Sequence, residues 1–198
     1  MLSKLKEIIS PVIFLIVTFC IFMPSSLFLG NIDQFAVGFA ALIPLLMAAS
    51  LITAVVVILV GLIVPKKICN IYAAVIFGGA LAAYVQGNFL NPDFGVLNGR
   101  QIQWSQFKVN AIISTVVWIV LIVVPPVVVC FKKNIMTNII KWGSLFLSSI
   151  QVVTLVVLIV SSKRSVDYSY VVTKNDEFAL SSQGNVVVFI VDTLDNDD

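Results

Sequence analysis

The sequence predicts an all-α polytopic membrane protein with five transmembrane helices, followed by the first strand of a truncated α/β domain. Of its 198 residues, 60% are hydrophobic and 11% are charged, and the mean hydropathy is +1.08. A soluble domain of this size cannot bury so much apolar surface, so lipid is the expected solvent. The apolar residues form five stretches, each near the roughly 20 residues that cross a bilayer as a helix. A short apolar run of a different kind follows near the end of the sequence.

The five apolar stretches contain no Lys, Arg, Asp or Glu, each of which would cost about 2.5–3.5 kcal/mol at a helix centre. They cover residues 8–29, 35–64, 68–85, 109–131 and 143–160. The second stretch is longer than a bilayer requires, and Pro44 indicates either a kink or the outer boundary of the helix. The apolar run of the first stretch exceeds that of a secretory signal and lacks a small-x-small cleavage site after it. We therefore expect an uncleaved anchor.

Basic residues in the connecting segments predict the orientation. One side carries several lysines, namely Lys4, Lys6, Lys66, Lys67, Lys132, Lys133 and Lys141. On the other side, the connection between the third and fourth stretches has only Arg100 and Lys108. The positive-inside bias therefore predicts a cytoplasmic amino terminus and an extracytoplasmic carboxyl terminus. Lys163 and Arg164 are a minor exception, because a long translocated domain crosses largely regardless of its charge.

Small and polar residues within the stretches predict helix contacts. The third stretch repeats small residues at four-residue spacing, at Ala74, Gly78 and Ala82, with Gly79 and Ala83 beside them. Small residues let helix backbones approach closely in lipid, so we expect packing there; a substrate passage is the alternative. On the fifth stretch, Ser144, Ser148 and Gln151 fall near one face and are expected to hydrogen-bond across the bundle, with channel lining as the alternative. Trp118, in mid-helix, is expected to pack against a neighbouring helix.

Several classes of function are disfavoured by composition. The chain has no His, which removes imidazole acid–base catalysis and imidazole metal ligation from these residues. Its net charge of +2 is too small to suggest nucleic acid as a partner. Cys20, Cys69 and Cys130 lie in or beside apolar stretches without CxxC spacing and are expected to be small apolar side chains without disulfides.

The composition of the sequence changes twice after the fifth stretch, first to polar and then to apolar residues. Residues 161–184 are polar, carry both signs of charge and are interpreted as an extracytoplasmic linker after the helical domain of residues 1–160. Residues 185–198 read NVVVFIVDTLDNDD. A strand that is apolar at every position is buried on both faces, as in a parallel sheet. Ligands of such sheets bind beyond the carboxyl ends of the strands, and Asp192 occupies that end. One strand cannot form a sheet, so we expect an amino-terminal fragment of a longer protein.

Five membrane segments, an outward carboxyl end and the NVVVFIVD run together resemble membrane-anchored sulfatase-like proteins. These belong to the alkaline phosphatase superfamily and include the lipoteichoic-acid synthase type. The resemblance implies an alkaline phosphatase-like α/β domain whose first strand ends on an acidic ligand of a catalytic divalent metal ion. Asp192 matches that position. Lipoteichoic-acid synthases usually carry Glu there and many sulfatases carry two consecutive Asp residues. The Asp192–Thr193 pair therefore indicates a relative outside both groups.

The resemblance implies chemistry at a phosphate or sulfate ester, where a divalent metal ion neutralises developing charge and helps to ionise a Ser or Thr nucleophile. The other ligands and the nucleophile would lie beyond residue 198, so no catalytic residue is predicted within this chain, and the fragment alone would be inactive. Thr193 is expected to cap a following helix. The remaining acidic residues, Asp195, Asp197 and Asp198, are interpreted as a solvated or helix-starting stretch.

The expected partners are the lipid bilayer and, through the resemblance, a cell-envelope polymer or lipid-linked substrate in the multi-pass cell membrane of a Gram-positive bacterium. The alternative hypothesis is a complete small polytopic membrane protein, such as a transporter subunit or an interaction partner, with an acidic tail. No Lys, Arg or carboxylate lies within the stretches to mark a transport path. An exposed VVVFIV run would also be an aggregation hazard in a tail without a structural role.

Overall fold

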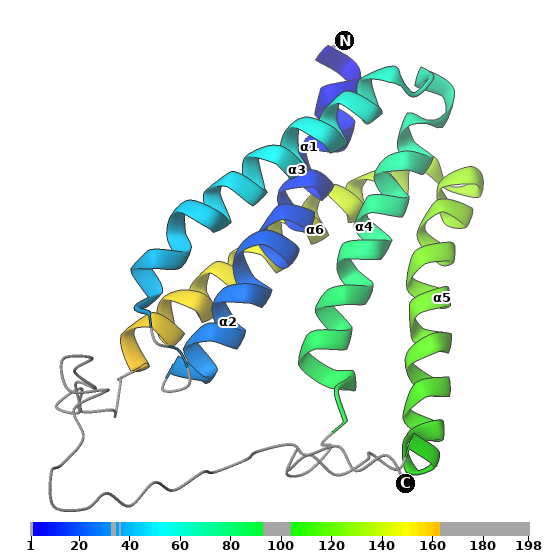
Figure 1. The fold of residues 1–198 in the computed structure, drawn as a ribbon. Coiled ribbons are helices and arrows are strands. Elements are labelled where there is room, and N and C mark those ends of the chain that lie inside the picture. Colours follow the sequence, from blue (N-terminus) through cyan, green and yellow to red (C-terminus); the bar gives the residue numbers. More distant parts are fainter. Residues whose placement is uncertain (1, 33–34, 36, 93–103, 163–198) are drawn as a thin grey trace, which may run out of the picture. The chain divides into compact units, whose positions relative to one another are not determined.

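The structure of the chain is a computed structural model that describes residues 2–32, 35, 37–92 and 104–162. Every regular element in these ranges is a helix, and five helical spans are long and apolar enough to cross a membrane (Figure 1). The prediction of five membrane-spanning helices is therefore confirmed. The predicted linker from residue 163 onward and the predicted strand lie outside the described residues.

The first span consists of α1 (Leu2–Ile16), a π-helical segment η1 (Val17–Phe22) and α2 (Met23–Gly30). The widened turn has a physical cause in Pro24, because a proline lacks the N–H of an α-helical bond and its ring clashes with the carbonyl four residues earlier. In the π-helical segment the N–H of Met23 donates to the carbonyl of Thr18, five residues earlier. The helix thus continues past the proline.

The second and third spans form a hairpin. The second comprises η3 (Phe39–Leu42) and α3 (Ile43–Ile63), and the third comprises η4 (Lys66–Ile68), α4 (Cys69–Val85) and the π-helical η5 (Gln86–Leu90). Pro44 lies in the first turn of α3, where its missing N–H costs no hydrogen bond. Of its two predicted roles, the helix boundary is therefore the one observed.

The fourth span consists of η6 (Trp104–Phe107) and α5 (Lys108–Phe131), and the fifth is α6 (Lys133–Ser161). Helix α6 begins ten residues before the predicted start at residue 143 (143 − 133). The prediction treated these polar residues as a connection. They contain no Gly or Pro that would end a helix, and long lysine side chains at a helix end can reach the aqueous interface, so the helix extends through them.

Helices α1 and α4 form the core of the bundle. About half of the most apolar window of the third span is buried (50%), and 44% of that of the first, whereas the second span has 6% and the fourth 11%. Helix α1 contacts α3, α4 and α6, and α4 packs along α5. Phe14 of α1 and Phe77 of α4 meet at the centre with ring centroids 5.9 Å apart. The outer faces of α3 and α5 expose rows of Val, Ile and Leu, as expected for helices that face lipid.

The small residues of α4 mark a close approach of two helix backbones. A Cβ atom on Gly78 would overlap the carbonyl oxygen of Leu121 and lie 3.1 Å from the Cα atom of Ile122, both on α5, whereas one on Gly79 would meet nothing within 4 Å. Ala74 and Ala82 are fully buried on the same helix. The predicted packing of this small-residue face against a neighbouring helix is therefore confirmed.

Candidate functional site

The predicted metal ligand Asp192 lies outside the described residues, as do Thr193 and the acidic residues that follow it. Within the part of the chain that the structure describes, no group of three or more Cys, Asp and Glu side chains is arranged to hold a metal ion. The predicted metal position stays a prediction. The described helices offer a different kind of site, a cleft at one end of the bundle.

The cleft has a volume of about 540 Å³ and lies between the first, third and fifth spans. Its lining comes from the end of η1, from α2 and the residue after it, from η5 and the residue after it, and from Leu158 of α6. These segments lie at the end of the bundle that is remote from the amino terminus and from the α3–α4 turn (Figure 1). We call it the cleft end. A volume of this size is within the range of small-ligand pockets.

Three asparagine side chains and Ser26 supply the polar lining of the cleft. Asn31 Nδ2 donates to the carbonyl of Leu27 over 2.9 Å, and Asn88 Nδ2 donates to the carbonyl of Tyr84 over 2.7 Å. Asn91 accepts from Gln86 Nε2 over 3.2 Å. The contacts of Asn31 and Asn88 are both exposed, so the remaining polar atoms of these two side chains can be hydrated.

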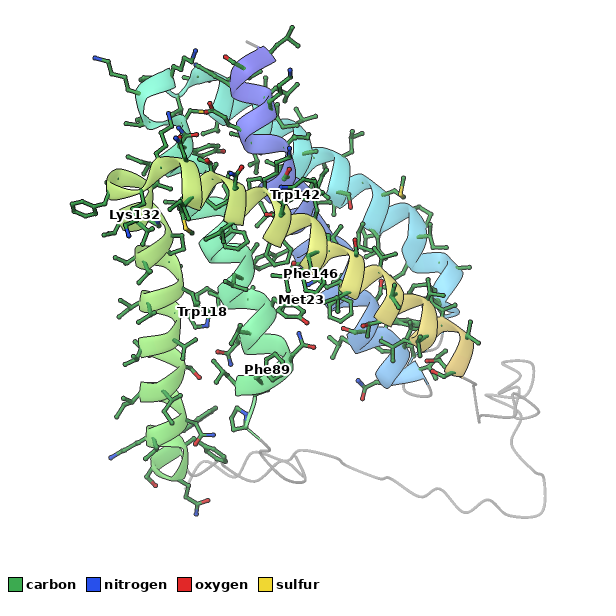
Figure 2. All side chains as sticks on the ribbon, turned by 180° about the vertical axis from the view of Figure 1, so that it is seen from behind. Met23, Phe89, Trp118, Lys132, Trp142 and Phe146 are labelled. Carbon is green, nitrogen blue, oxygen red and sulfur yellow. The ribbon has the colours of Figure 1, made fainter. Side chains whose placement is uncertain are left out.

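The apolar lining of the cleft comes from Phe22, Met23, Leu27 and Leu158. Met23 (labelled in Figure 2) reaches towards the third span. A Cβ atom on Gly87 would lie 3.1 Å from Met23 Cε. The first and third spans therefore meet at Met23 and Gly87. A larger side chain at position 87 would extend into the cleft.

Two pairs of polar side chains join neighbouring spans near the cleft. Thr18 of η1 and Gln151 of α6 exchange two hydrogen bonds: the threonine hydroxyl donates to Gln151 Oε1 over 3.2 Å, and Gln151 Nε2 donates back over 3.0 Å. Both side chains are buried. Trp118 of α5 donates from Nε1 to Gln86 Oε1 over 3.1 Å (Trp118 is labelled in Figure 2). Both π-helical segments are thereby fixed to a neighbouring span.

These contacts bear on two predictions from the sequence. The hydrogen bond of Gln151 across the bundle is confirmed, and so is the packing of Trp118 against a neighbouring helix. The same expectation is wrong for Ser144 and Ser148, which are buried without a hydrogen-bond partner for either hydroxyl among the described residues. Both serines lie on the buried face of α6 together with Gln151.

The opposite end of the bundle, which we call the lysine end, is held together by polar side chains. Lys4 Nζ donates to the carbonyls of Leu62 and Val64 over 2.8 and 2.6 Å. These carbonyls belong to the last turn of α3 and the residue after it, where a cation complements the helix dipole. Asn70 is buried, and with its amide nitrogen facing the carboxylate it donates to Glu7 Oε2 over 3.0 Å and accepts from Lys133 Nζ over 2.7 Å. Helices α1, α3, α4 and α6 are therefore connected at this end.

All three cysteines are free, with Cys20 and Cys69 buried and Cys130 exposed, in agreement with the prediction. Cys20 Sγ contacts Thr53 Oγ1 over 3.5 Å, and Tyr72 donates its hydroxyl to the carbonyl of Val57 over 2.7 Å. These two contacts and Lys4 attach α3, the least buried span, to the core of the bundle.

The cleft was not predicted from the sequence. Asn31, Asn88 and Asn91 fall outside the predicted apolar stretches, in the connections between them. A signal for the site existed in the position of these amides, each within a few residues of the end of an apolar stretch. The two π-helical segments that shape the cleft have no comparable signal, apart from Pro24.

The fold is that of a polytopic helical bundle whose five apolar spans fit a multi-pass membrane protein. No family model matches the chain, and neither a curated protein nor a solved structure is similar to it. The function is therefore argued from the residues themselves.

Proposed function

We propose that this chain is the membrane anchor of a sulfatase-like hydrolase or transferase that acts on phosphate or sulfate esters at the outer cell surface. The observation that carries the proposal is the run NVVVFIVD at residues 185–192, which follows five membrane-length helices and a polar linker. A fully apolar run that ends on a carboxylate is typical of a central strand that presents a ligand at its end. Asp192 would supply one carboxylate to a divalent metal ion, and the catalytic nucleophile would come from another part of the enzyme.

The arrangement of charges supports an orientation with the lysine end in the cytoplasm. The described basic residues Lys4 and Lys133 lie together there, since both contact residues of neighbouring helices at that end. By the positive-inside bias this end stays in the cytoplasm. Helix α6 starts at the lysine end and finishes at Ser161, so the chain would enter the linker outside the cell, where an external catalytic domain needs it.

A pair of reporter fusions after Ser165 tests this orientation. Alkaline phosphatase folds actively only outside the cytoplasm, whereas green fluorescent protein exported through the general secretory route stays dark. We expect an active phosphatase fusion and a dark fluorescent fusion, and matched fusions after Pro65 should give the opposite pattern. A fluorescent fusion at Ser165 with an inactive phosphatase would overturn the external location of the catalytic domain.

The coding DNA after codon 198 separates this function from the alternative of a complete small membrane protein. The proposal expects an open frame that continues into a Ser or Thr nucleophile and later Asp and His residues. A stop codon in the gene directly after Asp198, with no frame that resumes, would favour the small membrane protein.

A further inference from the structure

We propose that a pocket at the lysine end binds the phosphate group of one anionic phospholipid. The pocket is formed by α1, α4 and α6 and shares no lining residue with the cleft. The proposal goes beyond the function proposed above and does not depend on it, because it concerns the helical bundle alone. It is carried by two lysines without a carboxylate partner, by the polar lining of the pocket and by an apolar stripe beside it.

The pocket is small and its walls are fixed to one another. Its volume is about 160 Å³, below the range of about 300–1,000 Å³ for pockets that enclose a whole small molecule, so it suits a group of the size of a phosphate. The contacts of Asn70 with Glu7 and Lys133 connect the three helices. The lining consists of Lys6 and Glu7 of α1, Asn70 and Ala73 of α4, and Thr137, Asn138, Ile140 and Lys141 of α6.

The charge of the pocket favours an anion. Lys6 and Lys141 come from different helices, and neither forms an ion pair with a described residue. Glu7 is the only carboxylate in the described lining, which leaves a net charge of +1 (2 − 1). Its Oε2 atom accepts a hydrogen bond from Asn70, whose amide oxygen accepts from Lys133. A third lysine therefore lies behind the carboxylate and offsets its charge.

The amides of the pocket add hydrogen-bond donors to the two ammonium groups. Asn70 uses one amide hydrogen on Glu7 and has a second. The side chain of Asn138 forms no hydrogen bond with a described residue, so its amide hydrogens can bind a ligand. A phosphate diester only accepts hydrogen bonds, and bonds from an ammonium group to a phosphate oxygen are among the stronger ones. The donors of the pocket are therefore complementary to a phosphate.

An apolar stripe of α6 beside the pocket indicates that the phosphate belongs to a lipid. Ile139, Trp142 and Phe146 are exposed by 51, 63 and 66% (Trp142 and Phe146 are labelled in Figure 2). Their spacing of three and four residues places them on one face of the helix. The Nζ atom of Lys141 lies 5.0 Å from the centroid of the Trp142 ring, and tryptophan is enriched at the membrane interface. A phosphate held by Lys141 would thus lie at the headgroup level, with its acyl chains along the stripe, as in other basic pockets between membrane helices.

Binding is measured with the purified chain in phosphatidylcholine nanodiscs, with dioleoyl phosphatidic acid as the probe and native mass spectrometry as the readout. We expect one bound phosphatidic acid per chain. In the double variant Lys6→Gln/Lys141→Gln the affinity should fall about thirtyfold, which corresponds to about 1 kcal/mol for each lysine. An unchanged affinity in this variant would overturn the proposal.

A matched double variant separates a site from a general attraction between charges. Lys66→Gln/Lys132→Gln also removes two exposed lysines near this end of the bundle, but neither residue lines the pocket. Screening by salt weakens the effect of such charges, so the affinity should stay within about twofold of that of the unmodified chain. Equal losses in the two double variants would show that net charge, and not the pocket, attracts the lipid.

A second pair of variants tests the lining of the pocket without a change of charge. Asn138→Leu removes a donor from the pocket and should lower the affinity about fivefold, the loss expected for one hydrogen bond. Asn134→Leu is the matched control, because Asn134 lies one turn earlier on the exposed side of α6 and does not line the pocket. Its affinity should equal that of the unmodified chain. The proposal fails if the two variants bind phosphatidic acid equally well.

Two further probes identify the source of the phosphate. Dioleoylglycerol keeps the acyl chains and lacks the phosphate, whereas glycerol 3-phosphate keeps the phosphate and lacks the acyl chains. Each should bind more weakly than phosphatidic acid. Equal affinity for dioleoylglycerol would contradict the proposal in favour of a site for acyl chains alone, and equal affinity for glycerol 3-phosphate would contradict it in favour of a site for a soluble phosphate.

Discussion

Thr18 and Gln151 illustrate what single polar residues do in this bundle. Both are buried in the middle of apolar spans, and they exchange two hydrogen bonds between η1 and α6. In lipid no water replaces a lost partner, although a side chain can often find another group to bond. The pair therefore specifies which faces of the first and fifth spans meet, and its expected contribution to stability is modest.

A double-mutant cycle measures that contribution. The single variants Thr18→Val and Gln151→Leu and the double variant are unfolded in detergent micelles, and the coupling free energy is obtained from the four stabilities. We expect about 0.6 kcal/mol, the average for hydrogen bonds between membrane helices. A coupling indistinguishable from zero would mean that the two side chains do not meet in the folded protein.

Lys4 shows that a basic residue can have a structural role besides setting orientation. Its ammonium group donates to the last carbonyls of α3. Lys4→Met keeps the apolar stem and loses these bonds, so we expect a loss of stability of about 1 kcal/mol and faster amide hydrogen exchange in the last turn of α3. Lys6→Met removes the same charge from an exposed side chain and is the matched control. Equal effects of both variants would show that charge, and not the cap, is what matters.

Some residue contacts in this bundle follow from the sequence, and others do not. The hydrogen bond of Gln151 across the bundle and the packing of the small face around Gly78 follow from residue type and spacing. In lipid, a buried amide needs a hydrogen-bond partner, and a row of small residues allows close helix packing. The partner residues Thr18 and Leu121 could not be predicted, since a period of 3.6 residues indicates which face is buried but not which helix covers it. Asn31, Asn88 and Asn91 show no sequence pattern that predicts a shared cleft, apart from their position near the ends of apolar stretches.

The pairing of α4 with α5 includes one close backbone contact. Gly78 is the position where α4 lies directly against the main chain of α5 at Leu121. The neighbouring Gly79 has open space around it. Because adjacent residues of a helix point in different directions, two glycines in sequence have different roles.

Gly78→Ala and Gly79→Ala separate these roles. The added methyl group at position 78 forces the two backbones apart, and we expect a loss of about 2 kcal/mol in the free energy of unfolding, within the range for overpacked sites. At position 79 the same change should be neutral or stabilising by up to about 1 kcal/mol, because Ala is the better helix former. Thermal unfolding in detergent gives both values. A Gly78→Ala variant as stable as Gly79→Ala would contradict the close approach of α4 and α5.

The elements themselves were predicted more accurately in their apolar centres than at their ends. All five stretches became helical spans, because a membrane-length apolar run has few other stable conformations in lipid. The start of α6 at Lys133 was missed, since charge was interpreted as a connection. Sequence periodicity gave no indication of π-helical η5, which lacks a proline to explain it.

The two ends of the bundle differ in their polar and charged residues. The lysine end joins Lys4, Glu7, Asn70 and Lys133 across four helices, whereas the described lining of the cleft at the other end is uncharged. Under the proposed orientation, the lysine end would face the cytoplasm and the cleft end the outside. The proposed catalytic domain, which would follow α6 in the chain, would then lie outside the cell.

The most direct test of the proposed function is the metal content of the intact gene product with and without Asp192. The protein is purified in detergent, equilibrated with Mg²⁺, Mn²⁺ and Zn²⁺ and analysed by mass spectrometry of the bound metal. Asp192→Asn is compared with Asp195→Asn, an acidic neighbour that is not a predicted ligand. We expect a stoichiometric divalent metal ion in the unmodified protein and in Asp195→Asn, and its loss in Asp192→Asn. Equal metal content in all three proteins, or none in the unmodified one, would contradict the proposed function.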